Sequence, residues 1–63
     1  MNQFEEAARI NVERFLGDLD LESINDSDLF YENVYILAFD GAVDKGATQQ
    51  QAQQIAVLIS SQY

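Results

Sequence analysis

Residues 29–43 carry apolar side chains at nearly every position, which sets this stretch apart from the rest of the chain. At about 100° per residue, the apolar side chains fall on all sides of a helix. Only Asn33, Asp40 and Asp44 form a narrow polar strip. A helix that is apolar all round has to be buried all round. A chain of 63 residues can hardly cover such a helix alone, so the pattern predicts self-association.

A first helix is predicted at about residues 2–16. Asn2 suits the N-cap, and Glu5 three residues later completes a capping box. Gly17 is placed as the residue that ends the helix. One face is apolar and consists of Phe4, Ala8, Val12 and Phe15, with Leu16 at its edge.

A second helix is predicted at about residues 26–44, with Asn25 as its N-cap and Gly46 as its stop. Lys45 suits the negative end of the helix dipole. Gly41 lies within the pattern and costs up to about 1 kcal/mol relative to alanine. It indicates either a close helix crossing or a break after Asp40.

A third helix is predicted at about residues 48–61, because Thr48 and Gln51 have the spacing of a capping box. The glutamines of residues 49–54 lie largely outside its apolar face. This face comprises Ala52, Ile55, Ala56, Ile59 and Tyr63, and Leu58 widens it.

The expected fold is therefore all-α, with two to three helices in a small bundle or a helical hairpin, as one domain over residues 1–63. Residues 18–23 form an acidic connector. A strand at residues 30–39 is the alternative, because that segment is rich in aromatic and branched residues and Asp40-Gly41 is a hairpin turn signal. The helix is preferred because the apolar residues do not alternate and the helix-end signals agree.

Composition strengthens the case for a homodimer. A domain of this size is marginally stable unless disulfides, a metal or oligomerisation support it. The chain has no Cys and no His, which excludes disulfides and the usual thiolate or imidazole metal sites. Its net charge is −8, which disfavours nucleic acid and anionic membranes. With no signal peptide or membrane span in the sequence, we expect a cytoplasmic protein.

The sequence offers no support for catalysis, a cofactor or a metal. Without His or Cys, only Ser, Lys or carboxylates remain for nucleophilic or acid–base chemistry. Lys45, the only lysine, is better explained by its place at a helix end. Residues 18–29 resemble the start of a calcium-binding loop, but Ser23 and Leu29 stand where Gly and Glu are needed.

Direct nucleic-acid binding is not expected either. Residues 47–60 superficially resemble a helix-turn-helix, but phosphate contacts need free basic residues. Arg9 has Glu5 one helical turn away, and Arg14 has Asp18. The opposite hypothesis is a DNA mimic, whose acidic surface would meet a basic groove of a nucleic-acid-binding protein. Its candidate residues are Asp18, Asp20, Glu22, Asp26, Asp28 and Glu32. The competing explanation is that these acids keep a very apolar protein soluble.

The second predicted helix supplies the candidate contact residues, in the core or in an interface between copies. Tyr31 and Tyr35 lie near each other and suit an interface or a partly buried core position. The complete set is Phe30, Tyr31, Val34, Tyr35, Ile36, Leu37, Phe39 and Val43.

Taken whole, the chain resembles the small acidic helical proteins that lambdoid bacteriophages encode in their early regions. The resemblance rests on the start MNQFEEAARINVERFLG, on the absence of Cys, His and Pro, and on the length. It implies a regulatory protein that modulates phage or host development by protein contact in a bacterial cytoplasm. It assigns no site residues, and the protein partner stays unidentified.

Overall fold

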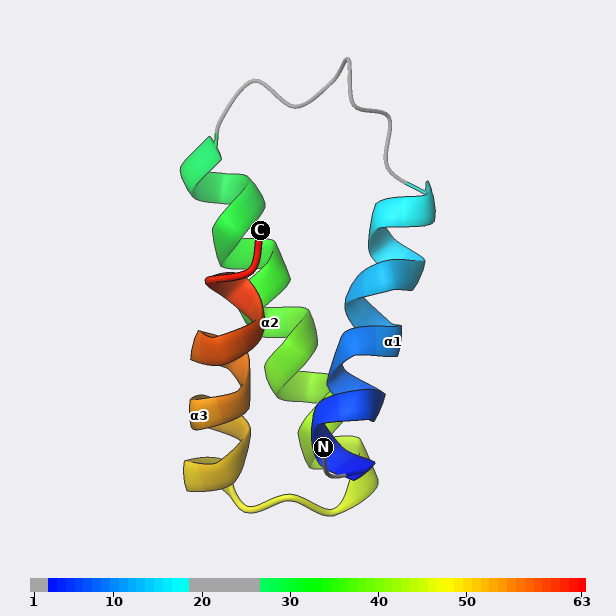
Figure 1. Cartoon of the computed structure of the whole chain (residues 1–63), viewed down its shortest axis with the longest axis vertical. Helices are drawn as coiled ribbons and strands as arrows, with labels where there is room; N and C mark the ends of the chain where they lie inside the picture. Colours follow the sequence, from blue (N-terminus) through cyan, green and yellow to red (C-terminus); the bar gives the residue numbers. More distant parts are fainter. Residues whose placement is uncertain (1–2, 19–26) are drawn as a thin grey trace.

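The computed structural model describes residues 3–18 and 27–63, and this part of the chain forms three α-helices and no strand. The helices are α1 (Gln3–Asp18), α2 (Ser27–Lys45) and α3 (Gln49–Ser60). Figure 1 shows α2 in the middle, with α1 on one side and α3 on the other. Helix α2 contacts both neighbours far more extensively than they contact each other. The all-α prediction is confirmed, and the alternative strand is wrong.

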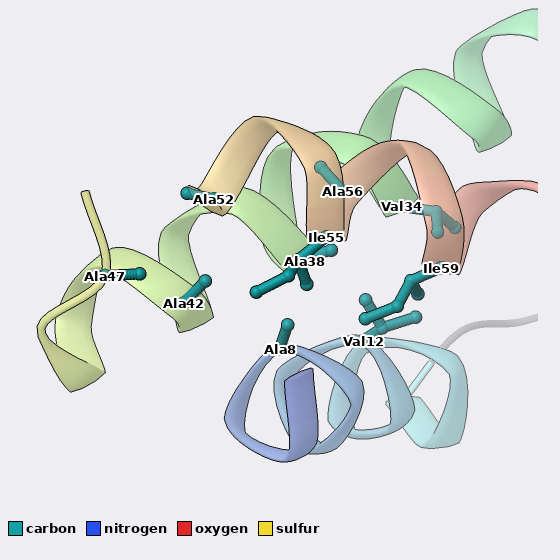
Figure 2. Close-up of a cluster of buried hydrophobic side chains, with 10 residues drawn as sticks. All are labelled: Ala8, Val12, Val34, Ala38, Ala42, Ala47, Ala52, Ile55, Ala56 and Ile59. Carbon is teal, nitrogen blue, oxygen red and sulfur yellow. The ribbon is translucent and has the colours of Figure 1, made fainter. Parts of the chain in front are cut away.

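The hydrophobic core is built mainly from alanine. Among the described residues, six of the ten buried apolar ones are alanines, and the largest fully buried side chains are Ile59, Val12 and Val34. In Figure 2, Ile59 of α3 and Val12 of α1 lie close together inside the bundle. The full core is Ala8, Val12, Val34, Ala38, Ala42, Ala47, Ala52, Ile55, Ala56 and Ile59. Small side chains let the helices approach closely, but they leave little room inside for the larger apolar residues.

Gly41 marks the close crossing of α1 and α2, and α2 runs through it without a break. A Cβ atom at this position would lie 2.9 Å from the backbone oxygen of Ala7 and 2.9 Å from the Cα of Ala8. Beside the crossing, Asn11 Nδ2 donates a hydrogen bond to the backbone oxygen of Leu37 at 2.8 Å. Of the two interpretations of this glycine, the close crossing is therefore confirmed.

The turn between α2 and α3 follows local sequence signals. Gly46 has a positive φ of 112°, a backbone conformation that favours glycine. Its N–H donates to the Val43 oxygen at 2.9 Å, and the Ala47 N–H donates to the Ala42 oxygen at 3.0 Å. Together these two bonds form a Schellman motif, which satisfies carbonyls at the end of α2. The predicted stop at Gly46 is confirmed.

The capping box of α3 is also confirmed. The Gln51 N–H donates to Thr48 Oγ1 at 3.2 Å. In return, the Thr48 N–H donates to Gln51 Oε1 at 3.0 Å. Two backbone donors at the start of the helix are thereby satisfied.

Three details of the sequence-based prediction need correction. Helix α1 does not end at Gly17 but continues to Asp18, and Gly17 lacks a positive φ. A glycine ends a helix by adopting the left-handed conformation, and Gly17 does not adopt it. Leu58 and Tyr63 do not extend the buried face of α3 but are exposed. Asn2, Asn25 and residues 19–23 lie outside the described residues.

Candidate protein interaction surface

The eight candidate contact residues of α2 divide into an inner and an outer group. Val34 is buried in the core. Four large side chains pack against the core while staying partly exposed, namely Phe30, Tyr35, Leu37 and Phe39. The remaining three, Tyr31, Ile36 and Val43, are exposed. The apolar circumference of α2 is therefore only partly covered by α1 and α3.

Three exposed apolar side chains of α2 share one line along the helix, which we call the outer strip. They are Leu29, Ile36 and Val43, with exposed fractions of 54%, 45% and 40%. Residues seven apart drift by only about 20° around a helix, so all three lie on one side. Ile36 follows Val34 by two residues, or about 200° of rotation, which places the outer strip opposite the core-facing side.

The spacing of the outer strip is that of a coiled-coil seam. Its members occupy one of the two seam positions in three successive heptads; at the other position, half-buried Phe39 follows Ile36 by three residues, whereas the acid Glu32 follows Leu29 by three. Apolar residues at such positions pack as knobs into the holes of a facing helix. The surface thus has the dimensions and chemistry of a helix-binding face.

Acidic residues border the outer strip on both sides. Glu32 and Asp40 are exposed and lie four residues before and after Ile36, so they are rotated about 40° from it in opposite directions. Asp28 and Asp44 are also exposed and lie eight residues before and after Ile36, about 80° away in the two directions. The strip is therefore apolar along its centre and negative along both edges.

The basic residues lie elsewhere. Arg9 Nη2 is 3.5 Å from Glu5 Oε1, one helical turn away in α1, as predicted. Its Nη1 donates to Gln62 Oε1 at 2.8 Å. Arg14 and Lys45, the other two cations of the chain, line a shallow groove between α1 and α2. Lys45 is nine residues from Ile36, which places it about half a turn from the outer strip.

The predicted acidic surface is described only in part. Asp28 and Glu32 are both exposed on α2. The side chain of Asp18 and the residues Asp20, Glu22 and Asp26 lie outside the described part of the structure. What the structure adds is that Asp28 and Glu32 share their helix with the outer strip.

Helix α3 presents a different surface. Gln50, Gln53, Gln54 and Val57 line a shallow hollow on it. Val57 is 55% exposed but has no exposed apolar residue seven positions before or after it. The chain has no charged side chain after Lys45, so this surface is neutral. Helix α3 thus exposes the neighbouring residues Val57 and Leu58, but its surface lacks the seven-residue spacing and the acidic borders of the outer strip.

The C-terminal residues make two contacts that the sequence analysis did not find. Tyr31 Oη donates to the backbone oxygen of Tyr63 at 2.7 Å. Together with the hydrogen bond from Arg9 to Gln62, this contact ties the tail to α2 and α1. The partners are 32 and 53 residues apart, and no local pattern signals such pairs.

Metal-ligand clusters and membrane spans are both absent from the described residues. Residues 3–18 and 27–63 contain no group of three or more acidic side chains placed to hold a metal ion. None of the three described helices is both long and apolar enough to cross a membrane.

Comparison with known proteins adds no assignment. No family model, no curated protein and no solved structure matches this chain.

Proposed function

We propose that this protein is a small regulatory protein that works by contact with other proteins, and that the outer strip of α2 is its contact surface. One observation carries the proposal: Leu29, Ile36 and Val43 are 54%, 45% and 40% exposed and lie in line on the central helix. Their exposure leaves apolar area in water that a facing helix would remove.

Self-association through the outer strip is part of this proposal. The spacing is symmetric about Ile36, because Leu29 precedes it and Val43 follows it by seven residues. Two antiparallel copies of α2 would therefore place Ile36 against Ile36 and Leu29 against Val43. Such an arrangement is an isologous contact of the kind found in twofold homodimers.

The biological setting rests on the resemblance to early proteins of lambdoid phages. We propose that the protein modulates phage or host development in a bacterial cytoplasm. The absence of nucleophilic His and Cys from the sequence supports a role by binding rather than by catalysis.

The first test is the state of association of the wild type and two matched variants. Analytical ultracentrifugation at micromolar concentration is expected to show a dimer for the wild type. Ile36→Glu places a charge at the centre of the strip and is expected to give a monomer. Val57→Glu places the same charge on the comparably exposed surface of α3 and should leave the dimer intact.

Circular dichroism of both variants checks that each keeps its helices, so that a loss of association is not mistaken for unfolding. A wild type that sediments as a monomer would refute self-association. An Ile36→Glu variant that associates like the wild type would show that the outer strip is not the contact.

A further inference from the structure

We infer that the occupant for which the outer strip is best suited is a basic amphipathic helix of another protein, with one apolar stripe between two borders of Lys or Arg. This inference rests on the proposed function, because it concerns the same strip. It adds the chemical class of the partner and ranks that partner above a second copy of this chain.

The borders of the strip carry the argument. Glu32 and Asp40 flank Ile36 at about 40° on either side, and Asp28 and Asp44 flank it at about 80°. In paired helices, the residues beside the apolar seam face each other and select the partner by charge. Here acids stand on both sides of the strip, with uncharged Phe39 and Asn33 between them, so a facing helix with basic residues on both of its borders gains attraction on each side.

A second copy of the chain fits these borders less well. Pairing two outer strips brings the acids of one α2 close to the acids of the other, and like charges across an interface are unfavourable. The three cations of the chain are not on these borders. Arg9 is engaged with Glu5 and Gln62. Arg14 and Lys45 line the groove between α1 and α2, where Asp44 is the one border acid beside them, while Asp28, Glu32 and Asp40 do not line that groove.

The length of the strip defines the size of the partner. Leu29 and Val43 are 14 positions apart, which corresponds to about 21 Å along a helix at 1.5 Å per residue. A partner helix of about four turns covers it. This is short for a stable isolated helix, so the matching segment belongs to a folded protein or becomes helical on binding.

The salt dependence of binding distinguishes a basic helix from a second copy of the chain. Binding of a basic helix weakens as salt screens the attraction between opposite charges, whereas pairing of two acidic copies strengthens as salt screens their repulsion. The basic helix and the second copy also compete for the outer strip, because each of them covers Ile36.

The test uses the full chain and three synthetic peptides of about 18 residues, a length that covers the strip with a turn to spare. The first has Leu at the a and d positions of each heptad and Lys at e and g. The second replaces every Lys by Glu. The third keeps the composition of the first but scrambles it, so that the charge remains and the stripe is lost. Fluorescence anisotropy reports binding at about 50 mM and about 500 mM salt.

The Lys peptide is expected to bind at least about tenfold more tightly than the Glu peptide at the lower salt, with a smaller ratio at the higher salt. It should also displace the second copy, so that a preformed homodimer dissociates as the peptide is added. Ile36→Glu should abolish binding of the Lys peptide, and Val57→Glu should not. The double substitution Glu32→Gln and Asp40→Asn keeps the apolar strip and should reduce the advantage of the Lys peptide several-fold.

Equal binding of the Lys and Glu peptides would overturn the inference, although the strip would remain a contact surface if Ile36→Glu still removed self-association. Equal binding of the first and scrambled peptides would also overturn it, and would favour recognition by acidic charge alone, as in the DNA-mimic hypothesis. If Ile36→Glu changed neither peptide binding nor self-association, the proposed function would fail as well.

Discussion

Helices α2 and α3 are both rich in apolar residues, but they use them differently. In α3 the buried residues Ala52, Ile55, Ala56 and Ile59 form one face, and glutamines occupy much of the rest. In α2 the apolar residues surround the helix, so that one set enters the core and a second set, the outer strip, does not. Within one chain, α3 leaves Val57 and Leu58 exposed side by side, whereas α2 leaves exposed apolar residues in a line that repeats every seven positions.

The difference also lies in the size of the inward-facing residues. The core-facing side of α2 combines the small residues Ala38, Gly41 and Ala42 with fully buried Val34. Its aromatic residues Phe30, Tyr35 and Phe39 pack against the core while partly exposed, whereas Leu29, Ile36 and Val43 lie exposed on the outer strip. Helix α3 instead places its large Ile55 and Ile59 inward. Helix α2 therefore leaves three large apolar side chains exposed in one line away from the core.

The strongest test of this comparison uses two isoleucines. Ile59→Ala in α3 removes a fully buried side chain and is expected to lower the free energy of unfolding by about 2–5 kcal/mol. Ile36→Ala in α2 removes a side chain that is 45% exposed, and in the monomer it should cost less than about 1 kcal/mol. Urea unfolding followed by circular dichroism measures both.

Protein concentration sharpens the same test. If copies pair through the outer strip, association stabilises the folded state by mass action, and wild-type stability rises with concentration. The loss of unfolding free energy caused by Ile36→Ala should then grow with protein concentration. The loss caused by Ile59→Ala should change little. Equal costs for the two variants at every concentration would contradict the division of α2 into an inner and an outer side.

The second test compares two glycines. Gly41→Ala introduces a Cβ atom 2.9 Å from backbone atoms of Ala7 and Ala8, which cannot move without separating α1 from α2. We expect a loss of about 1–3 kcal/mol in unfolding free energy. Gly17→Ala meets nothing within 4 Å and lies inside α1, so the better helix propensity of alanine should stabilise the protein by up to about 1 kcal/mol.

Thermal unfolding of the two glycine variants beside the wild type gives the sign of each effect. A Gly41→Ala variant as stable as the wild type would mean that α1 and α2 do not approach as closely as the structure shows. A destabilised Gly17→Ala variant would indicate that Gly17 ends the first helix, as the sequence predicted.

The elements that sequence reasoning predicted well are those encoded by short-range signals. The stop at Gly46 and the capping box of Thr48 and Gln51 depend on residues within a few positions of each other. The buried face of α3 follows from a single clear periodicity. Leu58 was misplaced because it precedes Ile59 by one residue, a rotation of about 100°, which puts it beyond the edge of the buried face.

The candidate contact surface was predicted less completely, for a physical reason. When apolar residues surround a helix, its pattern has no preferred direction, and only the positions of the neighbouring helices decide which side is covered. The sequence therefore named Val34 and Ile36 together, although one is buried and the other exposed. It also left both interpretations of Gly41 open, because a glycine signals a close approach only once the opposing helix is known.

The smallest expected effect concerns the start of α3. Thr48→Ala removes the side-chain oxygen that accepts the hydrogen bond from the Gln51 N–H at 3.2 Å. Loss of an N-cap typically costs about 1 kcal/mol, and the exposed donor can turn to water. Denaturant unfolding should show this loss, and Thr48→Ser, which keeps the acceptor, should restore most of it. Because Thr48 is remote from Ile36 in the chain and caps only α3, the variant should keep the wild-type dissociation constant in sedimentation. A change in association with Thr48→Ala would show that α3 takes part in the contact and that the two helices are less different than the structure indicates.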